Sequence, residues 1–461
     1  MIFWIILKKS QMKRVIKIKK IISLLLVITL FSTLCGCGSK NALKIMAGDG
    51  QLFATVKSDR AVRKNPDKAY LEIVVAQAVQ ILADINKINA DEAKNLLYKG
   101  GYTVYTALER DVNENLAKAL SEKDKETEVA ATVTDMDANI IAVYSTKKGK
   151  ENFATTTYKP CSSFKPLSVY APAIDSGVIN WSSRYEDSPY KYVKNLEGVM
   201  RPWPANSSEY YSERYVYIYQ AIKESLNTAA VKCLADYGVD KSIEFLETNF
   251  NIPVSAEKLA SKAKGADEVI GNIALGLLTN GVNTVDMAGY YQIFANGGKY
   301  EAPKAVLKIC DAKGKTVYER KHEPKQVIKT TTAEIMNQLL KEVVTKGGTG
   351  EKAKCEKVEV AGKTGTDDGG KTNWFVGVTP EYSIALWHGA SVKNDAAEYF
   401  GDAVNKIYEN KTNFKRKFPY KASLTRVAYC TESGKKFKAG CSFIRMGYYT
   451  RENVPDLCDR H

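Results

Sequence analysis

The order of strand-like and helix-like segments constrains the fold of this chain more than any other feature. Two alternating apolar runs, Val129 to Asp135 and Ile140 to Ser145, are joined by a short polar turn and predict a hairpin. Helical patterns dominate from Ser162 to about Asn296. Strand patterns then return and a last helix follows, at Lys357 to Val360, Trp374 to Val378, Ser383 to Trp387 and Asp395 to Tyr408. This order predicts an α+β fold in which an antiparallel sheet is flanked by helices and carries an inserted all-helical lobe.

The segment before this sheet predicts a smaller attached unit. Tyr70 to Leu97 has helical periodicity and ends before Gly100-Gly101, a helix stop. A strand at Tyr102 to Thr106 and a helix at Asp111 to Ser121 follow. Gly38 to Pro66 is polar and weakly patterned, which indicates a tether with a short ordered stretch.

The first 37 residues have the composition of an export signal. A basic stretch from Met12 to Lys20 precedes an apolar run from Ile21 to Leu34, whose fourteen residues are too few to span a bilayer comfortably. The sequence Leu34-Cys35-Gly36-Cys37 resembles a bacterial lipobox and predicts lipidation at Cys37, with an uncleaved anchor helix as the alternative. Seven of the positive charges behind the net charge of +15 lie within the first 37 residues. This distribution is better suited to contact with an anionic membrane or wall surface than to binding a nucleic acid.

Nine cysteines in 461 residues are too few for a disulfide scaffold. Cys430, Cys441 and Cys458 cluster in the last segment, where one disulfide is compatible with export. Zinc is disfavoured there because only His461 lies nearby, and the other two histidines have no partner pattern for a triad or a metal site. The sequence therefore predicts neither a metal nor a cofactor.

The chain contains a single Lys-Thr-Gly sequence, in Lys363-Thr364-Gly365-Thr366, shortly after the alternating segment Lys357 to Val360. A strand edge of this composition offers a cation, two hydroxyls and a glycine that lets another peptide lie close to the backbone. Such an edge suits the capture of an extended peptide that ends in a carboxylate.

A serine with a lysine three residues later occurs seven times, so context decides between the matches. Ser162 lies where a helical pattern begins, and there Lys165 can reach its hydroxyl while the helix N-terminus favours a nucleophile. An N-capping serine is the ordinary interpretation of the other six. Ser225-x-Asn227 falls in a short break between helical patterns, where a helix-joining turn is the alternative to a site. A lysine whose pKa is lowered by burial near Lys363 can serve as the base in place of histidine.

These three motifs, in this order, resemble the active-site triplet of serine enzymes that react with penicillin. From about Asn65 to His461 the chain is similar to a bacterial penicillin-binding protein of the bifunctional, class A kind. The stretches that carry the likeness are Lys159 to Pro166, Ser225 to Ala229, Gly281 to Gly298, Gly348-Thr349-Gly350, Gly362 to Thr366 and Trp374 to Gly377. The resemblance implies the fold shared by penicillin-binding transpeptidases and serine β-lactamases. It also implies a D,D-transpeptidase that attacks the D-Ala-D-Ala bond of a peptidoglycan stem peptide through an acyl-serine intermediate.

A role for each motif residue follows from the same resemblance. Ser162 is implied to be the nucleophile and Lys165 its base. Ser225 is implied to relay a proton to the leaving amine, Asn227 to hold Lys165 and the substrate amide, and Lys363 to tune the electric field.

The strand edge is implied to bind the substrate through Thr364, Gly365 and Thr366, with both threonines on the terminal carboxylate. The backbone amides of Ser162 and Thr366 are implied to form the oxyanion hole. One departure from the family lies beside the nucleophile, where Cys161 stands in place of the usual glycine.

Class A proteins carry a glycosyltransferase domain before the linker, but fewer than thirty residues separate Cys37 from Asn65 here, so we expect that domain to be missing. The expected division is a lipoprotein signal peptide (1–37), a tether (38–64), a linker or pedestal (65–128), a transpeptidase domain (129–415) and a cysteine-containing tail (416–461). The expected location is the outer face of a bacterial cell membrane, held by the N-terminal lipid. The expected partners are stem peptides, β-lactams and a separate glycosyltransferase, with no nucleic acid.

Other functions remain open on the same residues. A D,D-carboxypeptidase or endopeptidase would use the same groups, and a catalytically weak lipoprotein would bind wall precursors or β-lactams without turnover. A β-lactamase is disfavoured, because Glu268-x-x-x-Asn272 has the spacing of a deacylating motif but lies where the family has an ordinary helix.

Overall fold

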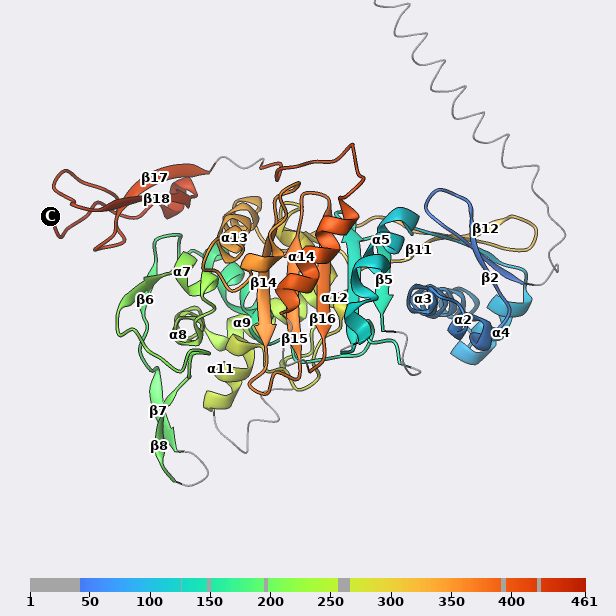
Figure 1. The fold of residues 1–461 in the computed structure, drawn as a ribbon, viewed down its shortest axis with the longest axis horizontal. Helices are drawn as coiled ribbons and strands as arrows, with labels where there is room; N and C mark the ends of the chain where they lie inside the picture. The colour runs from blue at the N-terminus through green and yellow to red at the C-terminus, as the bar shows by residue number, and fades with distance from the viewer. Residues whose placement is uncertain are drawn as a thin grey trace, which may run out of the picture.

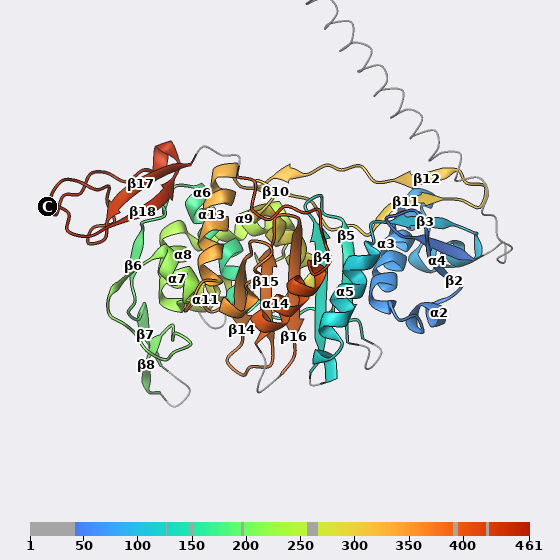
Figure 2. The same cartoon turned by 45° about the horizontal axis from the view of Figure 1, so that its top comes forward.

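The computed structural model describes residues 42–125, 127–146, 151–194, 198–255, 266–390, 395–420 and 424–461. The predicted signal peptide, and with it the predicted lipidation site Cys37, lies outside these residues. Figure 1 and Figure 2 show a central sheet, a smaller sheet to one side of it and a C-terminal hairpin on the opposite side.

A five-stranded antiparallel sheet forms the centre of the fold, in the order β14-β15-β16-β4-β5. Its strands are β4 (Val129–Asp135), β5 (Ile140–Ser145), β14 (Ala361–Thr366), β15 (Asn373–Val378) and β16 (Tyr382–His388). Every residue of β15 and β16 is buried, because both faces of the sheet are covered. The predicted antiparallel sheet with flanking helices is confirmed.

Helices cover the two faces of this sheet. On one face α5 (Arg110–Leu120) and α14 (Ala396–Ile407) share a core with Leu386 of β16. On the other face α12 (Thr284–Tyr291) shares a core with Trp387, the next residue of the same strand. Neighbouring residues of β16 thus face opposite sides of the sheet, as the two-residue period of a strand requires. The helices predicted at 111–121 and 395–408 are confirmed as α5 and α14.

Much of the chain between β5 and β14 forms the lobe that carries most of the candidate site. Its helices are η2 (Cys161–Phe164), η3 (Pro166–Tyr170), α6 (Ala171–Asp175), α7 (Ile218–Lys223), α8 (Asn227–Tyr237), α9 (Val239–Phe250), α11 (Ala266–Leu275), η4 (Gln292–Phe294) and α13 (Thr330–Val343). The lobe is mainly helical rather than all-helical, because β6 (Arg184–Glu186) pairs with β9 (Tyr215–Tyr217) and β7 (Lys191–Lys194) with β8 (Met200–Trp203). Strands of three or four partly exposed residues are too short for a two-residue period to stand out in the sequence.

A second five-stranded sheet, here called the outer sheet, has the order β12-β11-β3-β1-β2. Its strands are β1 (Leu43–Met46), β2 (Leu52–Val56), β3 (Thr103–Thr106), β11 (Val306–Cys310) and β12 (Thr316–Glu319). The predicted strand at 102–106 is confirmed as β3. The tether expected over 38–64 is contradicted from residue 43 onward, because β1 pairs with β2 and with β3 and the helix α2 (Asp59–Arg63) follows. Four- and five-residue strands gain their stability from partners that are distant in sequence, which a local pattern does not reveal.

Two helices, α3 (Lys68–Asn86) and α4 (Ala90–Lys99), replace the single helix expected over Tyr70 to Leu97. Lys87 ends α3 in the left-handed conformation with a φ of 56°. Asn89 then caps α4, its side chain accepting a hydrogen bond of 2.9 Å from the amide three residues later. The apolar spacing continues through the break, so periodicity alone does not reveal it.

The helix α3 is the one helix of the described residues that is long and apolar enough to cross a membrane. Its residues Tyr70, Leu71 and Val74 are fully buried, and it packs against both β5 and β11. The apolar surface of α3 therefore serves the core between the two sheets.

The strand β14 begins at Ala361, later than the strand expected at Lys357 to Val360. The backbone amide of Glu359 donates to the carbonyl of Arg416 at 2.9 Å, and Val358 and Val360 are buried in the core beneath α14. The alternation of apolar and charged residues from Lys357 to Val360 therefore reflects the packing of a loop and not a strand. Lys363-Thr-Gly-Thr lies inside the edge strand β14, as the sequence predicts.

The C-terminal hairpin consists of β17 (Thr425–Cys430) and β18 (Ile444–Tyr449). It packs on the helical lobe near β6 and α7, where Trp181 makes an edge contact with Tyr448 at a ring separation of 5.0 Å. The remaining short elements are η1 (Lys123–Lys125), β10 (Lys299–Tyr300), β13 (Lys325–Gln326), η5 (Glu351–Ala353) and η6 (Arg451–Asn453).

Candidate active site

The turn that carries Ser162 begins a continuous helical stretch through η2, η3 and α6. The expected helix start is present, but its first turn is a 3-10 turn and its second a π-helical turn. In a 3-10 turn, side chains three residues apart eclipse one another, which places Ser162 and Lys165 in line. Ser162 is partly exposed, whereas Cys161 and Ser163 on either side of it are buried.

Cys161 occupies the left-handed region with a φ of 52°, a conformation that glycine adopts freely. Its amide donates to the carbonyl of Gly276 at 2.9 Å. Burial raises the pKa of the thiol to about 12, so the side chain is a neutral thiol at neutral pH. Cys161 therefore takes the backbone role that a glycine would have and brings no reactive thiolate next to Ser162.

The central sheet holds this turn in place by direct contact. A Cβ atom on Gly365 would lie 2.4 Å from the carbonyl oxygen of Pro160 and 2.9 Å from the amide nitrogen of Ser163. Trp374 of β15 donates from its indole nitrogen to the carbonyl of Lys159 at 2.9 Å. The peptide that lies close to Gly365 is thus the turn of the chain that bears Ser162.

Lys165 is completely buried, and both hydrogen-bond acceptors of its amine are neutral oxygens. The Nζ atom donates to the carbonyl of Ser225 at 2.8 Å and to Oδ1 of Asn227 at 2.6 Å. Burial, and then the nearby charge of Lys363, hold the pKa of Lys165 well below its usual value. A neutral amine is the state that can accept a proton.

Lys363 is also completely buried, and it reaches Ser225 from the other side. Its Nζ atom donates to Oγ of Ser225 at 2.7 Å and to the carbonyl of Thr364 at 3.1 Å. Burial lowers the pKa of Lys363 to about 7. Among the described residues, no carboxylate forms an ion pair with either Lys165 or Lys363.

Ser225 lies in the break between α7 and α8, with a φ of 60°. The expected interruption of the helical pattern is therefore present. It lets the carbonyl of Ser225 face Lys165 while its hydroxyl faces Lys363, an arrangement that a continuous helix would not allow.

A polar network that sequence reasoning missed holds Asn227. The side chain of Asn227 donates to the carbonyl of Ala205 at 2.7 Å, and its backbone amide donates to Oδ1 of Asn206 at 2.9 Å. Asn206 and Thr228 both donate to Oδ1 of Asp187 at 2.7 Å. Asp187 and Asn206 lie in the part of the lobe where no motif spacing marks them, so only the folded chain reveals their role.

The open side of β14 presents its threonines. The strand is at the edge of the central sheet, Thr364 is partly exposed and Thr366 is exposed. Thr364 donates from its hydroxyl to the hydroxyl of Thr349 at 2.9 Å, which identifies Thr349 as a further member of the site. An edge strand with accessible hydroxyls can pair with an extended peptide.

The comparisons with known proteins all point to one protein family. The model described as Penicillin binding protein transpeptidase domain matches residues 117–411. Penicillin-binding protein 1A of Clostridium acetobutylicum is 31% identical over 376 residues, which cover 74% of this chain and 44% of that protein. Penicillin-binding protein 4 of Bacillus subtilis is 30% identical over 300 residues, which cover 64% of this chain and 45% of that protein. The chain thus spans less than half the length of these relatives.

Solved structures share the fold. Penicillin-Binding Protein 1A from Haemophilus influenzae matches with a TM-score of 0.65 at 16% identity, covering 90% of this chain and 98% of that one. The PonA1 protein from Mycobacterium tuberculosis in complex with penicillin V matches with a TM-score of 0.60 at 20% identity, covering 77% of this chain and 96% of that one. The fold is therefore that of a penicillin-binding transpeptidase domain. Since the family match extends over more than half of its length, the chain belongs to the penicillin-binding protein transpeptidase family.

The close approach at Gly365 leads to a prediction. The change Gly365→Ala should lower the free energy of unfolding by about 1–3 kcal/mol, because the new methyl group must displace backbone atoms of the Ser162 turn. It should also slow covalent labelling by a fluorescent penicillin. Gly369→Ala is the matched control, because a Cβ there meets only the Lys371 side chain at 3.6 Å or more. Equal behaviour of the two variants in thermal unfolding and labelling would contradict this account.

Proposed function

We propose that this protein is a D,D-transpeptidase that acts on peptidoglycan stem peptides through an acyl-enzyme at Ser162. One arrangement carries the proposal: two buried lysines meet at Ser225, close to the turn that exposes Ser162. An acyl-transfer enzyme needs such groups, because its nucleophile must lose a proton and its leaving amine must gain one. Membership of the penicillin-binding transpeptidase family supports the same chemistry.

In the proposed acylation step, the neutral amine of Lys165 takes the hydroxyl proton of Ser162 as the oxygen attacks the carbonyl carbon of the penultimate D-Ala. The bond from that carbon to the terminal D-Ala nitrogen breaks. Ser225 gives its proton to the departing nitrogen and takes one from Lys363, 2.7 Å away. Before and after the step, the two lysines together carry one positive charge. The step moves this charge from Lys363 to Lys165.

The transfer step reverses these proton movements. The amine of a neighbouring stem attacks the acyl carbon and gives up a proton through Ser225 to Lys363. The Ser162 oxygen leaves and regains its proton from Lys165. With water as the acceptor the same residues would give a carboxypeptidase, so the products of an assay with stem peptides distinguish the two reactions.

The substrate is proposed to lie along β14 as an added strand, with its terminal carboxylate at Thr364 and Thr366 and its amide at Asn227. The exposure of Thr366 and the position of β14 at the sheet edge support this placement. The backbone amides of Ser162 and Thr366 are proposed as the oxyanion hole, where each such donor stabilises the transition state by roughly 3 kcal/mol.

The assignment of the nucleophile is tested by covalent labelling with a fluorescent penicillin. Ser162→Ala should abolish the label. Ser163→Ala should keep it, because the Ser163 hydroxyl is buried and donates to the carbonyl of Pro160 at 2.6 Å. Cys161→Gly should also keep it, because glycine adopts a φ of 52° without strain. A label that survives Ser162→Ala would refute the assignment.

The lysine pair predicts how acylation depends on pH. Lys165 must be unprotonated and Lys363 protonated, so the rate constant should fall on acidification and fall again as the pH rises beyond about 7, where Lys363 loses its proton. Lys165→Ala should lower the rate by about 10²–10⁴-fold through loss of base assistance. Stopped-flow acylation across the pH range measures both. A rate that keeps rising toward the ordinary lysine pKa of about 10.4 would contradict the proposed states.

We also propose that the protein works at the outer face of the cell membrane, anchored by a lipid on Cys37. The apolar run Ile21 to Leu34 and the sequence Leu34-Cys35-Gly36-Cys37 support this proposal. Mass spectrometry of the membrane-extracted protein should find a diacylated cysteine as its first residue, and an intact Met1 or Met12 would exclude it.

Glycan strands are proposed to come from a separate glycosyltransferase. Within the described part of the chain, residues 42–125 fold as β1, β2, α2, α3, α4, β3 and α5, which complete the outer sheet and cover the central one. Supplied with lipid II alone, the purified protein should therefore form no glycan strands, and cross-linking should appear once a separate glycosyltransferase is added. Polymerisation of lipid II by this protein alone would overturn the proposal.

A further inference from the structure

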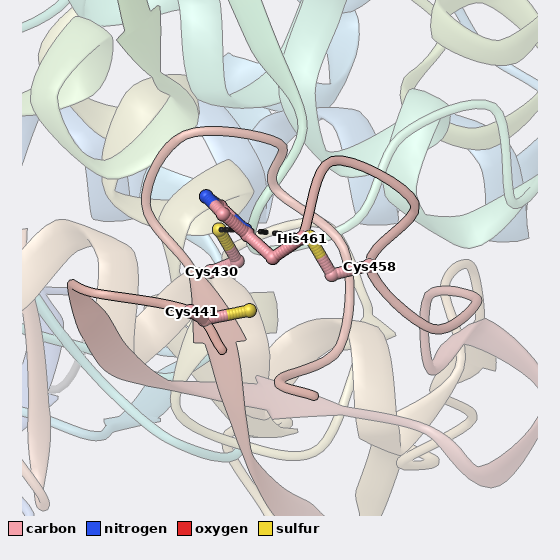
Figure 3. Close-up of side chains that lie close together, drawn as sticks. All are labelled: Cys430, Cys441, Cys458 and His461. Carbon is pink, nitrogen blue, oxygen red and sulfur yellow. Dashed lines mark hydrogen bonds between the residues drawn. The ribbon is translucent and has the colours of Figure 1, made fainter. Parts of the chain in front are cut away.

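The C-terminal tail gathers four side chains that the proposed catalysis does not use. Cys430, Cys441, Cys458 and His461 place one ligand atom each within 4.8 Å of all the others. Figure 3 shows the three sulfur atoms and the imidazole ring converging from separate segments of the tail. The three cysteines are free thiols, so the disulfide considered from the sequence is not formed in this structure.

Two of the spacings within this cluster match those of a tetrahedral zinc site. Nδ1 of His461 lies 3.4 Å from Sγ of Cys458 and 3.8 Å from Sγ of Cys430. Ligands at the usual Zn–S and Zn–N distances of about 2.3 Å and 2.0 Å would have sulfur and nitrogen about 3.6 Å apart. Three sulfurs and one imidazole nitrogen are also a ligand set that selects zinc over harder ions.

The surroundings of the cluster orient its ligands independently of the cluster itself. Glu432 accepts a hydrogen bond from Nε2 of His461 at 3.1 Å, which leaves the Nδ1 lone pair directed toward the sulfurs. The amide of Glu432 donates to Sγ of Cys430 at 3.4 Å, and the hydroxyl of Ser433 donates to Sγ of Cys458 at 3.3 Å. Donors to sulfur stabilise thiolates, and a carboxylate behind the histidine is the usual support of a metal-bound imidazole.

We propose that Cys430, Cys441, Cys458 and His461 bind one structural zinc ion. On binding, the three thiols release their protons and the ion takes four protein ligands, which leaves no open position for catalysis. This proposal replaces the sequence-based prediction that the chain has no metal site. The sequence disfavoured zinc because only one histidine accompanies the three cysteines, whereas the folded tail brings the four ligand atoms into one cluster.

The proposed ion would stabilise the loop by which the tail docks on the helical lobe. Within Cys430 to Lys435, the carbonyl of Thr431 accepts from Tyr217 at 2.6 Å and the carbonyl of Gly434 accepts from Ser182 at 2.6 Å. Arg184 of β6 donates to the carbonyl of Glu432. Tyr217 directly precedes α7, the helix that ends just before Ser225. Zinc would thus fix the tail against the part of the lobe that presents Ser225.

The test is the metal content of the full-length protein, purified without chelator or added metal, together with a count of its free thiols. We expect one zinc per chain by inductively coupled plasma mass spectrometry. Cys458→Ser and His461→Ala should each lose it, whereas Cys310→Ser, a buried cysteine of β11 outside the cluster, should keep it. Removal of zinc from the unaltered protein by a chelator should expose the tail to limited proteolysis.

Two results would overturn the proposal. One is a protein without metal in which two of the three tail cysteines form a disulfide, as export to an oxidising compartment would permit. The other is a zinc content that Cys458→Ser and His461→Ala leave unchanged. Penicillin labelling of Ser162 is followed in the same samples, so that loss of the zinc site and failure of the proposed catalytic function are told apart.

Discussion

The structure of the site depends on the burial of two lysine side chains whose hydrogen-bond acceptors are neutral oxygens. Lys165 and Lys363 lie on either side of Ser225, and no carboxylate of the described residues neutralises them. A buried ammonium group without a counter-ion is unfavourable, so burial lowers both pKa values, and the nearby charge of Lys363 lowers the pKa of Lys165 further. In the proposed mechanism, this pair holds one proton, so that Lys165 can take a proton from Ser162 while Lys363 gives one to the leaving amine through Ser225.

Three distant parts of the chain must meet to create this environment. The turn of Ser162 follows the first hairpin of the central sheet, Ser225 lies in the middle of the inserted lobe, and Lys363 comes from the edge strand β14. The contact at Gly365, where the strand backbone touches the Ser162 turn, fixes their separation. The network from Asp187 through Asn206 fixes Asn227 in turn. The burial of both lysines therefore requires that the lobe pack against the sheet.

Much of this could be predicted from residues in sequence order. The hairpin of β4 and β5, the strands β15 and β16, and the helices α5 and α14 have clear periods because each buries a large apolar surface. The apolar pattern predicts a strand at Lys357 to Val360, earlier than β14. The true strand has a weak pattern because it contains Gly362 and Gly365, where the backbone must approach its neighbours closely. The strand β1 and the Asp187 network could not be predicted, since each depends on partners that a local pattern does not reveal. The sequence places Cys430, Cys441, Cys458 and His461 in one segment, but only the folded chain shows that their ligand atoms converge.

The most direct test of the central claim is an NMR titration of the side-chain carbons next to the amines of Lys165 and Lys363, assigned by comparison with the Lys165→Arg and Lys363→Arg variants. Our account predicts that Lys165 titrates at a lower pH than Lys363, that Lys363 titrates near 7, and that the neutral replacement Lys363→Met raises the pKa of Lys165. Titration of both lysines near the ordinary value of about 10.4, with no effect of one on the other, would contradict it.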